Sequence, residues 1–478
     1  SKTLQEGAKK RRHTCQDLSS ELEKKINKMK KSIKLIILFA VLHFTASAQY
    51  IYTVAGEGGI EAFTGDSIEA TLTRLGAPRG VNVDASGNVY IGDGSNCRIR
   101  KVLASTGFIY TIVGTGTCGH SGDSGVASLA TIGFPRSVKF DAAHNLYFSE
   151  NLYIRKVDAV TNIITTIAGT GSSTFNGDNI LAVNANIVPR YIDIDYLGNI
   201  YFADGNNSRI RKIDASTGII TTIAGTGSPG YTGDSGLAIN ARICNNPEGI
   251  ALDANNNIYI GDYGNNCIRR IDHTTGIITT VAGTGVLGYN GDNILATDAQ
   301  LNHPYNVCFD LNGNLLIGDG DNFRIRKIDH QTGIITTFAG NGNSGYCCDN
   351  VLATSTPIAT TYDLCFDIWG NEYHTDGNRI RKITALPTGN QETKLLDNVV
   401  SVYPNPATNS ITIHQDNYSP NEQIIITDIM GHEVYKAPLT GIDNTIELTK
   451  WSSGVYFYEV RGSGLQIPTS IRGKFIKE

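Results

Sequence analysis

The stretch that decides the fold is residues 189–227, which read PRYIDIDYLGNIYFADGNNSRIRKIDASTGIITTIAGTG. This pattern returns six times along the chain, and equivalent glycines follow one another at intervals of 55 to 58 residues. The glycines end an Ala-Gly or Val-Gly step and are Gly56, Gly114, Gly169, Gly225, Gly283 and Gly340. A period of this length marks a repeat architecture, in which each unit buries its faces against its neighbours.

Each repeat divides into four short runs separated by turn residues. In the first complete repeat these runs are residues 81–84, 88–93, 98–102 and 108–113. They are rich in Ile, Val, Thr and Tyr and are punctuated by Gly and Asn, a pattern that favours strands over helices. Four-stranded units arranged radially form a β-propeller.

The two ends of the repeat region complement each other. Residues 50–55 match the fourth strand of the repeat, but the other three strands do not precede them. The last repeat, residues 362–383, has the first three strands and lacks the fourth. The N-terminal strand is therefore expected to complete the last unit and to remove an exposed sheet edge, whereas a linear solenoid would leave it unpaired. We predict an all-β chain with a six-bladed β-propeller over residues 49–384.

The repeats resemble NHL repeats. The segment GVNVD…NVYIGDGSNCRIRKV at 80–102 carries the Gly-Val step before the first strand and the Arg-Ile step of the third. The other repeats follow the same pattern, with departures such as Thr361 in place of the opening Pro and Cys348 in place of a Gly. The resemblance implies a propeller but no particular ligand.

After the repeats, residues 385–398 are predicted to be a linker, and residues 399–478 a small β-sandwich. The latter segment resembles the C-terminal sorting domain of proteins exported by the bacterial type IX system. The motifs are YPNPA at 403–407, GVY at 454–456 and GKFI at 473–476. The resemblance implies that the type IX machinery is a partner and that the protein is secreted or attached to the cell surface. An ordinary binding sandwich is the alternative.

An export signal is predicted near the N-terminus. Residues 29–48 combine a basic start, a ten-residue apolar stretch at 35–44 and a small-residue cleavage site, so cleavage is expected between Ala48 and Gln49. The apolar run is shorter than the roughly 20 residues that span a bilayer, although a buried helix or membrane anchor remains the alternative. Residues 1–28 form a charged extension to which no function is assigned.

The charge of the exported part argues against nucleic acid as a partner. The first 48 residues hold 11 of the 40 basic and 4 of the 45 acidic residues, which leaves 29 basic and 41 acidic residues and a net charge of −12. Non-specific binding to nucleic acid needs a basic surface. We expect a monomer with no transmembrane segment.

Eight cysteines follow the signal, and an even number in an exported protein permits disulfides. The spacing within single repeats favours bridges Cys97–Cys118 and Cys244–Cys267. A bridge between Cys308 and Cys365, which occupy one position in adjacent repeats, is less favoured because neighbouring inner strands lie far apart. No zinc-binding spacing is present.

Two sets of carboxylates recur in every repeat and have two interpretations. One set lies in the loops before each first strand, and the other ends each second strand: Asp66, Asp123, Asp178, Asp234, Asp292 and Asp349; Asp93, Glu150, Asp204, Asp262, Asp319 and Asp376. They are suitable ligands for Ca²⁺. Pairing with the arginine that recurs in every third strand is the favoured interpretation, so calcium is possible but no cofactor is predicted.

Specific function is expected where the repeats differ. One variable position follows the Pro that opens each repeat, and we place it at the mouth of the channel: Arg79, Arg136, Arg190, Glu248, Tyr305 and Tyr362. A second lies inside the first strand and is expected to line the channel: Asn82, Lys139, Asp193, Ala251, Cys308 and Cys365. Arginines bind carboxylates and phosphates bidentately and tyrosines stack on sugars or peptides, although pairing of these arginines with loop acids is an alternative.

These residues predict a binding or adhesion protein for a protein, peptide or carbohydrate ligand. No catalytic motif of the common hydrolases is present, and the histidines are scattered over the repeats. The alternatives are a metal-dependent lyase or hydrolase with its site in the channel, and a ring with a purely structural role.

Overall fold

The computed structural model describes residues 49–385, 400–403, 406–415, 423–428, 432–461 and 470–477. The predicted signal, Ala48 and the charged extension lie outside these residues, as does nearly all of the predicted linker. Gln49 is the first residue of strand β1. The chain divides between Leu386 and Pro387 into two compact units. No helix among the described residues is long and apolar enough to cross a membrane.

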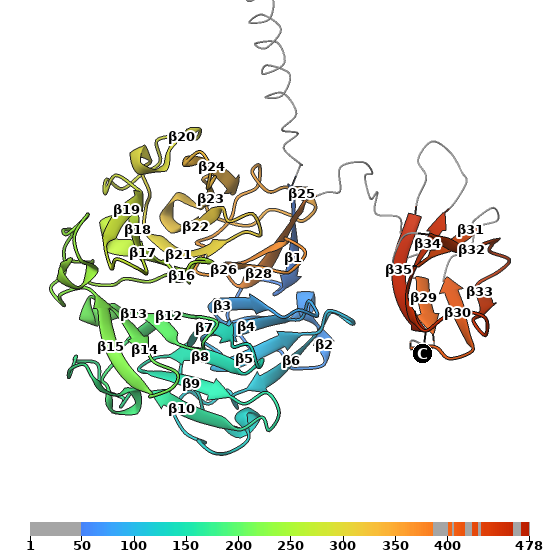
Figure 1. The fold of residues 1–478 in the computed structure, drawn as a ribbon, viewed down its shortest axis with the longest axis horizontal. Helices are drawn as coiled ribbons and strands as arrows, with labels where there is room; N and C mark the ends of the chain where they lie inside the picture. Colours follow the sequence, from blue (N-terminus) through green and yellow to red (C-terminus); the bar gives the residue numbers. More distant parts are fainter. Residues whose placement is uncertain are drawn as a thin grey trace, which may run out of the picture. The chain divides into compact units, whose positions relative to one another are not determined.

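The first unit consists of six antiparallel sheets of four or five strands (Figure 1). In spatial order the first sheet contains β2 (Ile68–Glu69), β6 (Phe108–Val113), β5 (Arg98–Val102), β4 (Val89–Asp93) and β3 (Pro78–Val83). The second contains β10 (Ile164–Ala168), β9 (Tyr153–Val157), β8 (Leu146–Glu150) and β7 (Pro135–Phe140). The third contains β11 (Ile180–Leu181), β15 (Ile219–Ala224), β14 (Arg209–Ile213), β13 (Ile200–Asp204) and β12 (Pro189–Ile194).

The other three sheets repeat this order. The fourth contains β19 (Ile278–Ala282), β18 (Cys267–Ile271), β17 (Ile258–Asp262) and β16 (Ile250–Leu252). The fifth contains β20 (Ile294–Leu295), β24 (Ile334–Ala339), β23 (Arg324–Ile328), β22 (Leu315–Asp319) and β21 (Pro304–Phe309). The sixth contains β25 (Val351–Leu352), β1 (Gln49–Ala55), β28 (Arg379–Ala385), β27 (Glu372–Asp376) and β26 (Leu364–Phe366).

Short 3₁₀ turns link these strands. They are η1 (Ala70–Leu72), η2 (Ala127–Leu129), η3 (Ala182–Asn184), η4 (Gly205–Asn207), η5 (Ala238–Asn240), η6 (Tyr263–Asn265), η7 (Ala296–Asp298) and η8 (Gly320–Asn322).

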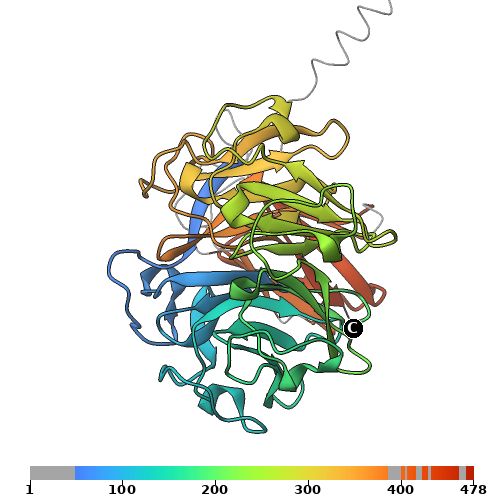
Figure 2. The same cartoon turned by 90° about the vertical axis from the view of Figure 1, so that its left-hand side faces the viewer.

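The sheets form a closed ring. Each inner strand contacts the inner strand of the next sheet, from β3 through β7, β12, β16 and β21 to β26, and β26 contacts β3. β1 pairs with β28, with Gln49 opposite Ala385 and Thr53 opposite Arg381. The prediction that the N-terminal strand completes the last unit is therefore confirmed, and Figure 1 shows the blue β1 beside the orange β28. Figure 2 shows the ring turned by 90°.

The hydrophobic core of this unit lies between the sheets. At the closing interface, Val81 and Ile91 of the first sheet pack in one buried cluster with Cys365 and Ile380 of the sixth. Similar clusters join the other neighbouring sheets. Because each sheet buries both faces in this way, one repeat cannot be stable alone.

Six arginines, one in each sheet, hold the outer loops to the strands. They are fully buried: Arg100, Arg155, Arg211, Arg269, Arg326 and Arg381. Each pairs with the loop carboxylate of its own sheet at 2.6 to 3.0 Å. Each also lies 3.1 to 3.8 Å from the carboxylate that ends the second strand. The expected pairing of both carboxylate sets with arginine is confirmed.

The cysteines only partly follow the predicted pattern. Cys97 and Cys118 form a disulfide with their Cα atoms 5.3 Å apart. Cys244 and Cys267 are buried free thiols, so the second predicted bridge is absent from the structure. Both thiols lie near the carboxylate of Asp262, and burial together with that negative charge raises their pKa values.

The second unit contains two antiparallel sheets among its described residues. One holds β29 (Val400–Tyr403), β30 (Ser410–Gln415) and β33 (Asp443–Glu447). The other holds β32 (Glu433–Pro438), β31 (Gln423–Thr427), β34 (Gly454–Arg461) and β35 (Ser470–Lys477). Their inner residues form a separate core that includes Ile411, Ile426 and Leu448.

Candidate functional site

The mouth of the ring lies where the inner strands begin. In four sheets the strand opens with a Pro that pairs with the acidic residue ending the second strand, and the register shifts directly afterwards. Such an irregularity in the ladder re-aims a side chain. The residue after the Pro therefore leaves the regular alternation of the strand. Arg79, Arg136, Arg190 and Tyr305 all occupy this position and are half-buried.

Aromatic side chains form one half of the mouth. The guanidinium carbon of Arg79 lies 3.4 Å from the ring centre of Tyr362, and Tyr362 meets the ring of Tyr305 edge-on at 4.8 Å. Tyr305 contacts Tyr263 at 4.9 Å, and Tyr263 stacks on His303 at 4.4 Å. Aromatic groups from the fourth, fifth and sixth sheets thus form a continuous wall that ends at an arginine of the first.

The predicted pairing of mouth arginines with acids holds only for Arg190. Its Nε lies 3.6 Å from Oε1 of Glu248, and its Nη2 donates to Oδ1 of Asn246 at 2.6 Å. The amide of Asn246 also donates to Glu248. This bonded triplet fixes Glu248, which is only 4% exposed.

The other two arginines of the mouth, Arg79 and Arg136, lie against aromatic rings. Among the described residues no carboxylate forms an ion pair with either guanidinium group, and the buried Nε of Arg79 has no hydrogen-bond partner. Arg136 lies 5.5 Å from the ring centre of Phe134. Burial, together with the nearby charges of Arg190 and Arg79, lowers the pKa of Arg136. The mouth thus holds three arginines and one glutamate, Glu248, so it is locally positive although the exported part of the chain is acidic.

Below the mouth, one side chain crosses the ring. Tyr191 of the third sheet is 1% exposed, and its hydroxyl donates to the carbonyl oxygen of Arg79 in the first sheet at 3.0 Å. Burial raises the pKa of Tyr191 well above its usual range. Because the phenol reaches from the third sheet to the first, it covers part of the channel.

Lys139 occupies the next layer. Its Nζ lies 3.8 Å from Oδ1 of Asp193, and its side chain is 17% exposed. Burial opposes its charge, but Asp193, Asp363 and the thiols of Cys365 and Cys308 together raise its pKa. The lysine of the second sheet is therefore within electrostatic reach of groups on the third, fifth and sixth sheets. The predicted lining residues come together, but around a charged side chain.

Two other lining residues connect neighbouring sheets. Asn82 donates to the carbonyl oxygen of Val138 at 3.0 Å. Asp193 accepts from the amide of Leu252 at 2.8 Å. These side chains supply hydrogen bonds between inner strands that no sheet ladder joins.

Sequence reasoning missed several residues of the mouth. Phe134, Asn246 and His303 all lie directly before the Pro that opens a repeat, a position whose identity changes in every repeat: Ala77, Phe134, Val188, Asn246, His303 and Thr360. Tyr263 replaces a residue that is Gly in four repeats. Comparing the repeats at these two positions, the residue before the opening Pro and the residue after the second strand, would have revealed these mouth residues.

The described residues offer few groups for metal chemistry. They contain no cluster of three or more His, Cys, Asp or Glu side chains arranged to hold a metal ion. The twelve recurring carboxylates considered for calcium are bound to buried arginines. They therefore serve the strands, and the mouth arginines and tyrosines are the candidate site.

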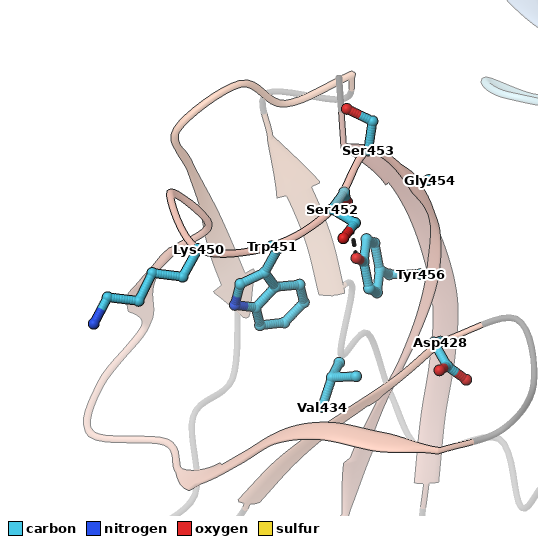
Figure 3. Close-up of a pocket in the computed structure, with 8 residues that line it drawn as sticks. All are labelled: Asp428, Val434, Lys450, Trp451, Ser452, Ser453, Gly454 and Tyr456. Atoms are coloured by element: carbon cyan, nitrogen blue, oxygen red, sulfur yellow. Dashed lines mark hydrogen bonds between the residues drawn. The ribbon is translucent and has the colours of Figure 1, made fainter.

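A separate depression lies in the second unit (Figure 3). Trp451 lies 4.9 Å from the ring of Tyr456, whose hydroxyl donates to the carbonyl oxygen of Ser452 at 2.8 Å. Asp428, Val434 and Lys450 complete its rim. The depression belongs to the segment that resembles a sorting domain.

Comparisons with known proteins agree with this division. Residues 401–476 match the family model of the secretion system C-terminal sorting domain, and residues 245–271 match that of the NHL repeat. NHL repeat-containing protein 2 of Bos taurus is 25% identical over 297 residues, which cover 55% of this chain and 40% of that protein. Protein SUPPRESSOR OF QUENCHING 1, chloroplastic, of Arabidopsis thaliana is 27% identical over 293 residues, or 58% of this chain and 27% of that protein. The chain thus spans well under half the length of these relatives.

Solved structures show the same fold at low identity. A structural genomics protein of unknown function from Bacteroides thetaiotaomicron matches with a TM-score of 0.54 and 18% identity, covering 70% of this chain and 76% of that one. An auxiliary nutrient binding protein from Bacteroides ovatus matches with a TM-score of 0.50 and 16% identity, covering 71% and 78%. The all-β first unit is therefore propeller-like. The chain is an exported protein, secreted or held at the cell surface, that carries NHL repeats and ends in a secretion system C-terminal sorting domain.

Proposed function

We propose that the protein is an exported binding or adhesion protein. In this proposal the six sheets are the blades of a closed six-bladed propeller, and the ligand binds at its mouth. The type IX machinery handles the C-terminal unit. The ligand is a carbohydrate or peptide that carries an anionic group beside a ring.

The observation that carries the proposal is the free positive charge of Arg79 and Arg136. No carboxylate among the described residues pairs with either group. A half-buried guanidinium group without a carboxylate partner loses solvation, so a ligand carboxylate that binds it bidentately recovers hydrogen bonds. The charge is retained although the exported part of the chain is acidic overall, which favours an anionic ligand over a cationic one.

The aromatic half of the mouth supports a ligand with a ring or a flat apolar surface. Tyr362, Tyr305 and Tyr263 lie in sequence around the mouth, and Tyr362 is already stacked under Arg79. Aromatic rings offer a large contact area at a small cost in conformational entropy. A sugar ring or an aromatic peptide side chain placed here brings its acidic group to the arginines.

The alternative of a lyase or hydrolase with its site deep in the channel receives less support. Tyr191 crosses from the third sheet to the first, and Lys139 lies among the inward-facing groups of several sheets. These side chains occupy the space that a channel substrate requires.

A comparison of two arginine variants tests the proposal. Acidic and neutral oligosaccharides and short peptides are screened by thermal shift, and each ligand that stabilises the protein is then titrated calorimetrically. Arg136→Ala should weaken binding of acidic ligands about 10- to 100-fold, the loss expected for a charged hydrogen-bonded pair. Arg270→Ala is the control, because it removes one positive charge from a third strand at a residue that pairs with Asp272 in the following turn and is not part of the mouth.

The proposal fails if acidic ligands bind the Arg136→Ala variant and the original protein equally well. It also fails if Arg270→Ala weakens binding to the same extent, since the effect would then reflect net charge.

A further inference from the structure

The ring has a second distinct face, opposite the mouth. The mouth lies where β28 begins at Arg379, close to Asp376 at the end of β27. β28 ends at Ala385, which pairs with Gln49 at the start of β1. The chain therefore enters and leaves the ring at the face away from the mouth. Ala385, the last described residue of the ring, lies at this face.

Turns that begin with an aspartate lie around most of this face. In the second to fifth sheets the turn between third and fourth strands begins with an Asp: Asp158, Asp214, Asp272 and Asp329. Hydrogen bonds from turn hydroxyls and amides hold these carboxylates ionised; those from Ser216 and Thr217 lower the pKa of Asp214 to about 2.

The acidic ring is interrupted at the sixth and first sheets. In the first sheet Leu103 occupies the position that is Asp in these turns. Phe108, the first residue of the fourth strand after this turn, is 36% exposed. In the sixth sheet the third and fourth strands come from distant parts of the chain, so no turn joins them. Lys101 and Lys382 lie beside tyrosine rings at 5.0 and 5.1 Å in these two sheets. This sector consequently has basic groups without the acidic turn.

Large apolar side chains lie in this sector and in the adjoining turn of the fifth sheet. Leu311 is 64%, Ile368 60% and Trp369 61% exposed, all in turns between first and second strands. They are neighbours: a Cβ atom on Gly370 would lie 3.5 Å from Leu311, and one on Gly87 would lie 3.3 Å from Trp369. The turns do not require these side chains, because Asp367 accepts the amides of Trp369 and Asn371 and so builds the turn itself.

We propose that Leu311, Ile368 and Trp369, with Leu103 and Phe108, form a lipid-contacting patch that lies on a membrane surface. The patch is at the face where the described part of the ring ends at Ala385, and tryptophan and aliphatic side chains together suit the membrane interface. Asp310 and Asp367 begin the turns that carry these side chains, and Glu69 lies opposite Phe108. The sixth and first sheets nevertheless lack the acidic turn of the other sheets and hold two lysines, which suits phospholipid head groups. The mouth then points away from the membrane.

The size and position of the patch favour lipid over a second copy of the chain. A stable protein interface buries about 800 Å² on each partner. Five partly exposed side chains supply much less than this. Stable attachment to a membrane takes two weak signals together. The C-terminal unit provides one signal when it holds the protein at the cell surface, and the patch provides the second.

The test uses protein recovered after export and vesicles of phosphatidylethanolamine with phosphatidylglycerol. Trp451→Phe leaves Trp369 as the single tryptophan. Its emission should shift to shorter wavelength on adding vesicles, and the protein should sediment with them. Ile368→Ser/Trp369→Ser, made in the original background, should reduce sedimentation at least tenfold.

Tyr196→Ser/Leu197→Ser is the matched control. These residues occupy the same turn positions in the third sheet and are 76% and 65% exposed. Their turn adjoins Ala215, next to Asp214, so it lies beside an acidic turn. This variant should bind vesicles like the original protein.

Absence of an emission shift overturns the proposal, as does an equal loss in the control variant. Sedimentation velocity without vesicles provides a further check. If the protein dimerises and Ile368→Ser/Trp369→Ser abolishes the dimer without changing vesicle binding, the patch serves a second copy and not lipid. Ligand binding at the mouth is measured separately, so either proposal can fail alone.

Discussion

At the scale of single residues, the ring is closed by polar side chains that reach between inner strands. Asp363 accepts from the amide of Val81 in the first sheet at 2.9 Å and from the side chain of Asn306 in the fifth. Asn306 in turn accepts from the amide of Ile250 in the fourth. Neighbouring inner strands diverge from one another and form no ladder, so these side chains satisfy amides that would otherwise be buried without partners.

Asp363 gives a prediction about pH. Burial raises its pKa to about 6, from 3.8 in the unfolded chain, although Lys139 opposes the rise. Because the folded state holds this proton more tightly, the contribution of Asp363 to stability is fully present below the unfolded pKa and is lost as pH rises through about 6. Between pH 7 and pH 5 that contribution should increase by about 1 kcal/mol.

Urea unfolding of the original protein and of Asp363→Asn at both pH values checks this. At pH 7 the variant should be less stable by about 1–3 kcal/mol, because one buried donor loses its acceptor. The difference between the two proteins should widen by about 1 kcal/mol at pH 5. A constant difference would show that Asp363 does not titrate in this range.

What the sequence could predict at this scale depends on repetition. The buried arginines and their carboxylates recur in every repeat, so their pairing was predictable. Asp363 and Asn306 occupy a position that is Gly80, Ser137, Tyr191 and Gly249 in the other repeats, and their partners lie in different repeats. Likewise Glu372 and His374 form a buried pair at 2.9 Å where the first repeat has Val89 and Ile91. The sequence shows that a residue departs from the repeat pattern, but not which residue of another repeat it contacts.

At the scale of elements, strand periodicity predicted most of the ring. The runs 98–102 and 108–113 coincide with β5 and β6, and residues 81–84 correspond to the second half of β3. The short outer strands, such as β2 and β11, were not predicted. Each contains two residues and pairs only with the edge of its sheet, so it carries no alternating pattern of its own.

The closing strand β1 allows a direct comparison with its counterparts. Ile51 in β1 and Ile109 in β6 are both fully buried, and each faces a third strand and a short outer strand. If β1 is an integral fourth strand, Ile51→Ala and Ile109→Ala should each reduce the free energy of unfolding by about 2–5 kcal/mol. Chemical unfolding of both variants measures this. A loss below about 1 kcal/mol for Ile51→Ala alone would mean that β1 is only loosely attached.

At the scale of the whole molecule, each of the two units has its own hydrophobic core. The core of the second unit includes Ala407, Ile413 and Val460 and contains no residue of the ring. The ring clusters contain no residue beyond Ile383. The sequence predicted this division, because the repeat stops abruptly and a polar segment follows. It could not predict that Ala385 lies at the face away from the mouth, which depends on the direction of β28 and its pairing with β1.

Separate cores predict separate unfolding. Each unit buries its own apolar surface, so calorimetry of the exported protein should show two transitions, and the larger enthalpy should belong to the ring because unfolding enthalpy scales with residue number. A chain that ends at Leu386 should keep the ring transition within about 2 °C of its original temperature, since no core residue is removed. Ile426→Ala, which is matched in chemistry to Ile109→Ala, should lower only the smaller transition. If the Ile426→Ala variant also shifts the ring transition, the two units are energetically coupled, and the C-terminal unit then contributes to the stability of the ring.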